Sequence, residues 1–161
     1  MVEISKKIVK ALTDKGLTLS CAESCTGGLV AKSITDVSGA SVVFWGGVVS
    51  YDNSVKENVL GVSRKTLDSV GAVSYDTARQ MAKGVRTLLK TDIGISTTGI
   101  AGPGGGTREK PVGTVYIGIA MENYEEAFLL QLDPQLSREE IREQTVSLLL
   151  AKTLEKISEN Y

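Results

Sequence analysis

The order of helical and strand patterns along the chain constrains its fold more than any other feature of the sequence. Apolar residues recur at helical spacing from Ile4 to Leu12, and Gly16 ends this first helix. Residues 18–22 then predict a short buried strand, and a second helical pattern covers residues 29–37. This alternation of helices and strands favours an α/β fold.

The middle of the chain continues the alternation. Residues 42–51 are rich in Val and aromatic residues and predict a strand with a bulge at Gly46-Gly47. Two short helices broken near Gly61 are expected within residues 53–70, and Ser63 is expected to cap the second. The clearest helix follows Ser74, whose side chain is expected to cap it. Its core face is predicted to be one continuous apolar stripe of Ala78, Met81, Ala82, Val85, Leu88 and Leu89.

The last part of the chain predicts a hairpin and a final helix. Residues 92–98 indicate a strand that leads into a glycine-rich loop at 99–106. The strands predicted over 112–120 and 124–132 have so short a connection that they must pair antiparallel. Ser137-Arg138-Glu139-Glu140 matches a capping box, so a helix is expected to begin there.

Length and composition fit a single domain over residues 1–161, and we predict a three-layer α/β/α sandwich with a mixed, mostly parallel sheet and an antiparallel hairpin. The net charge of −1 lacks the general field that draws proteins to nucleic acid or anionic membranes. No apolar run approaches the roughly 20 residues that span a bilayer, and the start does not resemble a signal peptide. We therefore expect a cytoplasmic protein with neither nucleic acid nor membrane as a partner.

The chain contains no histidine, which excludes every mechanism that uses imidazole as a base or a metal ligand. Proton transfer would then depend on Lys, Tyr, Asp, Glu or a thiolate. The only two cysteines, Cys21 and Cys25, cannot form a disulfide framework or a zinc site and are expected to be buried. We predict no metal and no cofactor.

Ser24 is the first candidate for chemistry. It lies where a buried strand turns into a helix, and such a junction exposes a hydroxyl and offers unpaired backbone N–H groups to an oxyanion. The alternative is structural: Ser24 or Thr26 caps the helix, and Gly27-Gly28 allows close packing. The residues alone leave both interpretations open.

Three further features are candidates for a site. The loop 99–106 is dense enough in glycine to line a small-molecule pocket, although a flexible loop is an equal alternative, and it is neither a Walker A loop nor a Rossmann fingerprint. Lys56 could act as a base only if buried, because burial lowers the pKa of a lysine. Arg142, at the border of the last helix's apolar face, would suit a phosphate or carboxylate if it faced inward.

Five motifs in register resemble the CinA C-terminal family, also called the PncC type, along nearly the whole chain. Each motif alone is weak, but their common order and spacing are specific. They are Ala22-Glu23-Ser24-Cys25-Thr26-Gly27-Gly28, Tyr51-x-Asn53-x-x-Lys56, Gly71-Ala72-Val73-Ser74, Gly99-Ile100-Ala101-Gly102-Pro103 and Lys110-Pro111-Val112-Gly113-Thr114-Val115.

The resemblance implies an amidohydrolase that converts nicotinamide mononucleotide to nicotinic acid mononucleotide and ammonia without a metal. It implies that Ser24 is the nucleophile, that Lys56 is its general base, that Tyr51 supports this pair and that Arg142 contacts the substrate. The other expected substrate contacts are Cys25, Thr26, Gly27, Gly28, Gly99, Ile100, Ala101 and Gly102. The oxyanion would be bound by backbone amides after Ser24 or by those of the glycine-rich loop.

Two alternatives stay open at this point. The chain could be a nucleotide-binding or regulatory module that does not turn its ligand over, with Ser24 only a cap. It could instead use Cys25 as the nucleophile, in which case alkylating agents would inactivate it. We also expect a homo-oligomer, as is common for small enzymes with an edge hairpin.

Overall fold

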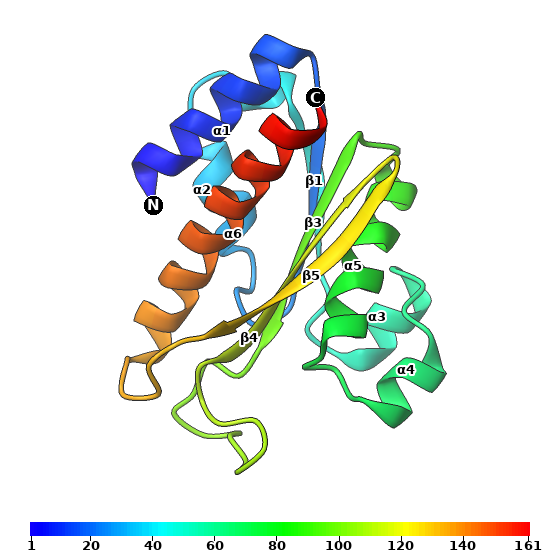
Figure 1. The fold of residues 1–161 in the computed structure, drawn as a ribbon, viewed down its shortest axis with the longest axis vertical. Coiled ribbons are helices and arrows are strands. Elements are labelled where there is room, and N and C mark those ends of the chain that lie inside the picture. Colours follow the sequence, from blue (N-terminus) through cyan, green and yellow to red (C-terminus); the bar gives the residue numbers. More distant parts are fainter.

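The computed structural model describes residues 1–161 and shows a five-stranded mixed sheet between two layers of helices (Figure 1). The strand order across the sheet is β2-β1-β3-β4-β5. β1 pairs in parallel with β2 and β3, whereas β4 is antiparallel to both β3 and β5, so four strands point one way and β4 alone points the other. The strands are β1 (Leu19–Glu23), β2 (Phe44–Val49), β3 (Ile93–Gly99), β4 (Thr114–Met121) and β5 (Tyr124–Gln131). The predicted α/β sandwich with a late hairpin is confirmed.

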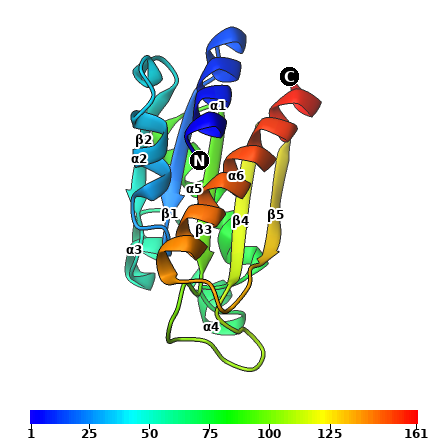
Figure 2. The same ribbon diagram turned by 90° about the vertical axis from the view of Figure 1, so that its left-hand side faces the viewer.

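The helices form one layer on each face of the sheet (Figure 2). One face is covered by α1 (Val2–Lys15), α2 (Leu29–Thr35) and α6 (Arg138–Asn160). The other face is covered by α5 (Tyr75–Leu89), with the short helices α3 (Asn53–Asn58) and α4 (Arg64–Ser69) beside it. A short 3₁₀ turn, η1 (Ala40–Val42), precedes β2. None of these helices is both long and apolar enough to cross a membrane.

The two faces of the sheet are packed differently. The α1, α2 and α6 layer buries the larger apolar cluster, which includes Ile8 and Ile141. On the other face α5 approaches the sheet so closely that a Cβ at Gly94 or Gly118 would overlap the carbonyl oxygens of α5. Ser96 Oγ in β3 also donates a hydrogen bond of 2.6 Å to the carbonyl of Ala78 in α5. Small residues in the sheet therefore determine how closely α5 packs against it.

Two sequence-based predictions need correction. Leu88 is 48% exposed and does not belong to the core face of α5. At 100° per residue only one of the adjacent positions 88 and 89 can continue the stripe toward the sheet, and Leu89 takes that place. In addition, α2 ends at Thr35, before the predicted end at Val37.

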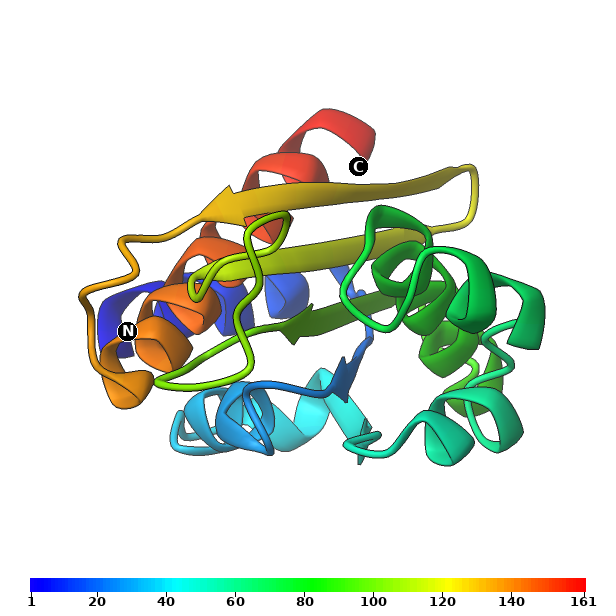
Figure 3. The ribbon, with the colours of Figure 1, turned by 90° about the horizontal axis from the view of Figure 1, so that it is seen from below.

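The carboxyl ends of β1, β2, β3 and β5 lie at one edge of the sheet, which Figure 3 shows from below. The turn after β1, the loop after β2 and the glycine-rich loop after β3 meet there with the first turn of α6. Open α/β sheets bind ligands in the crevice outside the carboxyl ends of their strands. This edge is therefore the place to look for a site.

Candidate active site

Ser24 and Lys56 lie next to each other at this edge. Lys56 Nζ is 3.1 Å from Ser24 Oγ, and it also donates hydrogen bonds to the carbonyls of Ser50 at 2.6 Å and Tyr51 at 3.4 Å. Ser24 follows β1 directly, and Lys56 projects from α3. A nucleophile within hydrogen-bonding reach of a base is the geometry that an activated serine requires.

Lys56 is only 1% exposed and is among the largest fully buried side chains of the protein. Its ammonium makes no ion pair, because its neighbours are a hydroxyl and two carbonyls. Burial lowers the pKa of Lys56, and the nearby Asp52 and Cys25 oppose this effect in part. The uncharged amine is the form that can accept a proton, and near neutral pH it is therefore a larger fraction of Lys56 than of a solvated lysine.

The alternative role of Ser24 as a helix cap is not what the structure shows. The backbone amides at the start of α2 donate hydrogen bonds to the Glu23 carboxylate, and the donors are the N–H groups of Gly28, Val30 and Ala31. Neither Ser24 nor Thr26 caps this helix. The Ser24 hydroxyl thus has Lys56 as its only hydrogen-bond partner in the protein.

A cavity of about 240 Å³ opens over the Ser24–Lys56 pair. It is built by five segments that are far apart in sequence, namely the loop after β1, the segment from the loop after β2 into α3, the end of β3 with the loop that follows it, the residues before α5 and the first turn of α6. Its lining consists of Ser24, Cys25, Tyr51, Asn53, Lys56, Ala72, Val73, Thr98, Gly99, Ala101 and Arg138.

Only some of the predicted substrate contacts line this cavity. Cys25, Gly99 and Ala101 do, whereas Thr26, Gly27, Gly28, Ile100 and Gly102 are not among the residues that line it. The Thr26 side chain is fully buried, and its hydroxyl bridges Glu23 Oε2 at 2.6 Å and Thr97 Oγ1 at 2.7 Å. The contribution of Thr26 to the site is therefore support of the turn.

The arginine in the cavity wall is Arg138, which the sequence motifs include only as part of a capping box. One guanidinium nitrogen of Arg138 donates to the carbonyl of Gly102 at 2.9 Å and the other to the hydroxyl of Tyr51 at 2.8 Å. Arg142, one turn further along α6, does not line the cavity and donates to the carbonyl of Thr26 at 2.7 Å. Arg138 and Arg142 are four residues apart and so lie on one face of the helix. This spacing is the sequence signal that could have identified Arg138 as a candidate site residue.

Tyr51 reaches the Ser24–Lys56 pair through its backbone. Its carbonyl accepts a hydrogen bond from Lys56, while its side chain is 60% exposed and its hydroxyl accepts from Arg138. Tyr51 therefore contacts the pair through its main chain, and its supporting role stays a prediction.

The two thiols are buried and free. Burial raises the pKa of Cys25 to about 12, and burial also raises that of Cys21. A thiol with such a pKa is almost entirely protonated at neutral pH and is a poor nucleophile. This finding weighs against Cys25 as the attacking group.

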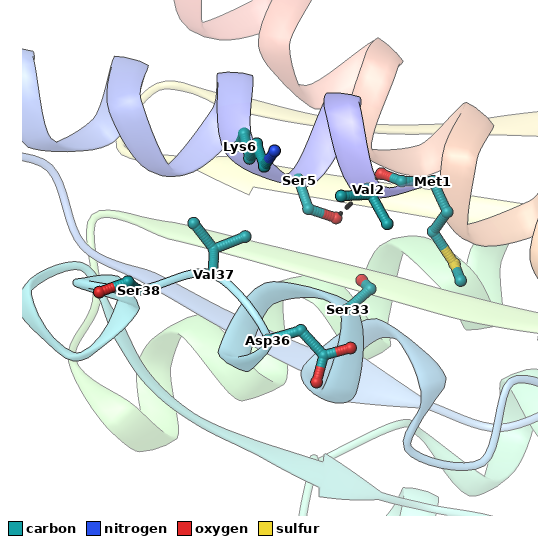
Figure 4. Close-up of a pocket in the computed structure, with 8 residues that line it drawn as sticks. All are labelled: Met1, Val2, Ser5, Lys6, Ser33, Asp36, Val37 and Ser38. Atoms are coloured by element: carbon teal, nitrogen blue, oxygen red, sulfur yellow. Dashed lines mark hydrogen bonds between the residues drawn. The ribbon is translucent and has the colours of Figure 1, made fainter.

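A second hollow of about 330 Å³ lies between the first residues of α1 and the end of α2 (Figure 4). Its only ionisable side chains are Lys6 and Asp36, and the hydroxyl of Ser5 is bonded to the carbonyl of Met1. The hollow contains no paired nucleophile and base. No three side chains of Cys, Asp and Glu come together anywhere in the structure in a way that could hold a metal ion.

Comparison with known proteins identifies relatives along almost the whole chain. The model of the CinA C-terminal domain matches residues 1–157. A competence-damage inducible protein of Thermoanaerobacter sp. (strain X514) is 58% identical over 144 residues, which are 89% of this chain and 34% of that protein. The chain thus spans about a third of the length of these curated relatives.

Solved structures agree with this assignment. The competence/damage inducible protein CihA from Agrobacterium tumefaciens has a TM-score of 0.93 at 40% identity, and the match covers 98% of this chain and 94% of that one. The competence damage-inducible protein A from Klebsiella pneumoniae subsp. pneumoniae MGH 78578 has a TM-score of 0.95 at 31% identity, covering 99% and 98%. By sequence and by fold, the chain belongs to the CinA C-terminal domain family.

Proposed function

We propose that this chain hydrolyses the carboxamide of nicotinamide mononucleotide, giving nicotinic acid mononucleotide and ammonia. The observation that carries the proposal is the buried Lys56 amine 3.1 Å from the Ser24 hydroxyl, at the floor of a cavity. The chemistry of this pair supports amide hydrolysis in general. The choice of nicotinamide mononucleotide rests on the family resemblance.

In the first half-reaction the neutral amine of Lys56 takes the proton of Ser24 as Oγ attacks the amide carbon. The tetrahedral intermediate collapses when Lys56 returns that proton to the leaving nitrogen, which departs as ammonia and leaves an ester on Ser24. Water then attacks the ester with Lys56 again as base. The carboxylate product leaves, and Ser24 recovers its proton.

The hydrogen bonds around Ser24 narrow the choice of oxyanion donors. The amides from Gly27 to Ala31 all have acceptors in the protein, whereas those of Cys25 and Thr26 have none. In the glycine-rich loop the amides of Ala101 and Gly102 also lack an acceptor. Cys25 and Ala101 line the cavity, so we assign the oxyanion to their N–H groups. Hydrolases of another α/β fold likewise combine the amide after the nucleophile with one from a second loop.

Arg138 is the group in the cavity wall best suited to the phosphate of the substrate. Its guanidinium is now bonded to two neutral oxygens, those of Tyr51 and Gly102, and a dianionic phosphate would compete well for such donors. Arg142 binds the Thr26 carbonyl, and its predicted contact with the substrate stays a prediction.

The decisive experiment measures ammonia release from nicotinamide mononucleotide by the wild-type protein, with a chelator present throughout. Ser24→Ala and Lys56→Met are assayed in parallel, and circular dichroism verifies that both are folded. We expect turnover by the wild type and loss of nearly all activity in both variants.

Cys25→Ala is the matched control, because it changes the neighbouring cavity residue without touching the hydroxyl or the amine. It should keep most of the activity. Loss of activity in Cys25→Ala but not in Ser24→Ala would instead identify a thiol enzyme. Binding of the nucleotide without ammonia release would replace the proposal by a non-catalytic binding module.

A further inference from the structure

Glu23 is a buried carboxylate that the mechanism above does not use. It is the last residue of β1, immediately before Ser24, and only 1% of it is exposed. None of the ion pairs in the structure involves it. A buried carboxylate without a cation is costly unless several donors bond to it, and such groups in native proteins call for an explanation.

The donors to Glu23 all belong to the turn and helix that carry the nucleophile, apart from the Cys21 thiol. Oε2 accepts from the hydroxyl of Thr26 at 2.6 Å and from the amides of Gly28 and Val30, both at 3.0 Å. Oε1 accepts from the amide of Ala31 at 2.8 Å and from the Cys21 thiol at 3.6 Å. The carboxylate thus replaces the side-chain cap that Gly28, at the N-cap of α2, cannot provide.

The main chain of Glu23 connects to the base. Its carbonyl accepts a hydrogen bond of 2.8 Å from the amide of Ser50. The carbonyl of Ser50 in turn accepts a hydrogen bond of 2.6 Å from Lys56 Nζ. The backbone amide of Ser24 itself donates a hydrogen bond of 2.9 Å to the carbonyl of Thr97 in β3. Ser24 is therefore held between two strands, and Glu23 is shared by the segments that carry the nucleophile and the base.

We propose that Glu23 is a positioning residue for the Ser24–Lys56 pair: by capping α2 from the end of β1 it holds the turn so that the Ser24 hydroxyl faces the amine and the Cys25 amide stays free. This inference rests on the proposed function. The Glu23 carboxylate does not line the cavity and bonds to neither Ser24 Oγ nor Lys56 Nζ, so its action is through the geometry of the turn.

The test compares Glu23→Gln with the wild type. The amide keeps the shape of the side chain but replaces one oxygen by an NH₂ group that faces backbone donors. We expect kcat to fall about ten- to hundredfold, as for a displaced nucleophile, with KM changed less than about twofold. The pH dependence should keep its midpoint, because Glu23 is not among the groups that shift the pKa of Lys56.

Thr26 provides a second, milder variant pair. Thr26→Val removes the hydroxyl that bonds to Glu23 while keeping the volume, and it should lower kcat, whereas Thr26→Ser keeps the hydroxyl and should restore most of the rate. Ile34→Val, in the buried face of α2 but outside the network, is the control for loss of stability alone. It should lower the melting temperature and leave the kcat of the folded protein unchanged.

A fluorophosphonate probe separates this inference from the choice of substrate. Ser24 Oγ attacks phosphorus, fluoride leaves and the proton passes to Lys56, so the rate of labelling, followed by intact mass, reports the pair without nicotinamide mononucleotide. Slow labelling of Glu23→Gln beside fast labelling of wild type supports the role of Glu23 even if no ammonia is released. If folded Glu23→Gln labels as fast as the wild type and also turns over substrate as fast, the role of Glu23 is overturned, while the deamidase proposal stands. A wild type that neither labels nor turns over overturns both proposals.

Discussion

At the scale of single residues, Lys56 shows how burial favours the neutral form of an amine. In the proposed mechanism Lys56 accepts a proton near neutral pH, which requires the pKa of its amine to be lowered. The structure does this by placing the amine among a hydroxyl and two carbonyls, away from any direct carboxylate partner. The charged form of Lys56 is then poorly solvated, which favours the neutral amine.

The charge of Asp52 can be used to test this explanation. Asp52 raises the pKa of Lys56 against the larger effect of burial, so Asp52→Asn should lower that pKa further. In the proposed mechanism the neutral amine is the active form, so the rise of kcat/KM with pH should move to lower pH. Asn also caps helices well, so α3 should remain intact.

The control for this prediction is Glu57→Gln, which removes the carboxylate next to Lys56 in sequence. Glu57 pairs with Arg64 and is not among the groups that shift the pKa of Lys56. Its pH profile should match the wild type. A shift of the Asp52→Asn profile to higher pH would contradict the assignment of Lys56 as the base.

Arg138 and Arg142 give a second residue-scale prediction. If Arg138 binds the substrate phosphate, Arg138→Ala should raise KM roughly ten- to a hundredfold, since a hydrogen bond to a charged group contributes about 1.5–3 kcal/mol. Arg142→Ala removes a support of the turn and should change KM much less. Steady-state kinetics on both variants decides this, and a rise in KM confined to Arg142→Ala would restore the assignment that the family resemblance implies.

At the scale of elements, α6 places Arg138 because its first turn is well defined. Ser137 and Glu140 form a complete capping box, and the predicted start of the helix is confirmed. Arg138 thus projects from a fixed helix end toward the loops after β2 and β3. A local sequence signal sets the position of a residue whose role depends on distant segments.

The close approach of α5 to the sheet predicts a large effect of one methyl group. A Cβ at Gly118 would overlap the carbonyl of Ala78 and the hydroxyl of Ser96, so Gly118→Ala should lower the free energy of unfolding by about 1–3 kcal/mol. Gly104→Ala, in an exposed loop with no atom near the added methyl, should stay within about 0.5 kcal/mol of the wild type. Denaturant titration measures both, and equal values would argue that α5 moves away at little cost.

At the scale of the whole molecule, the cavity joins five segments that otherwise have little in common. A ligand that fits it should therefore stabilise the entire fold. At a concentration one hundred times its Kd a ligand adds about 2.7 kcal/mol, which corresponds to a rise in melting temperature of roughly 5–10 °C for a protein of this size.

The measurement uses nicotinamide mononucleotide with Ser24→Ala, which we expect to bind the nucleotide without turnover. Arg138→Ala in the same background should show a much smaller rise at the same concentration. No rise with either protein at millimolar nucleotide would indicate that the cavity serves a different ligand.

The sequence by itself determined the elements and singled out Ser24 and Lys56 as candidates for the site. Helix and strand periodicity, the capping signals at Ser63, Ser74 and Ser137, and the short connection of β4 to β5 are local properties, and the structure confirms them. Ser24 and Lys56 could be chosen as candidates from the sequence because they lie in motifs of fixed spacing. The absence of histidine narrowed the choice of base further, since it left only amines, carboxylates, phenols and thiols to transfer a proton.

Only the tertiary structure decided how these residues are used. Whether Lys56 is buried, whether Arg138 or Arg142 lines the cavity, and whether Ser24 or Glu23 caps α2 depend on contacts between segments far apart in the chain. Arg138 and Tyr51, for example, are 87 positions apart and meet at 2.8 Å. Local patterns describe the conformation of a segment, whereas burial and pKa depend on everything packed around a side chain, which the order of residues along one segment does not contain.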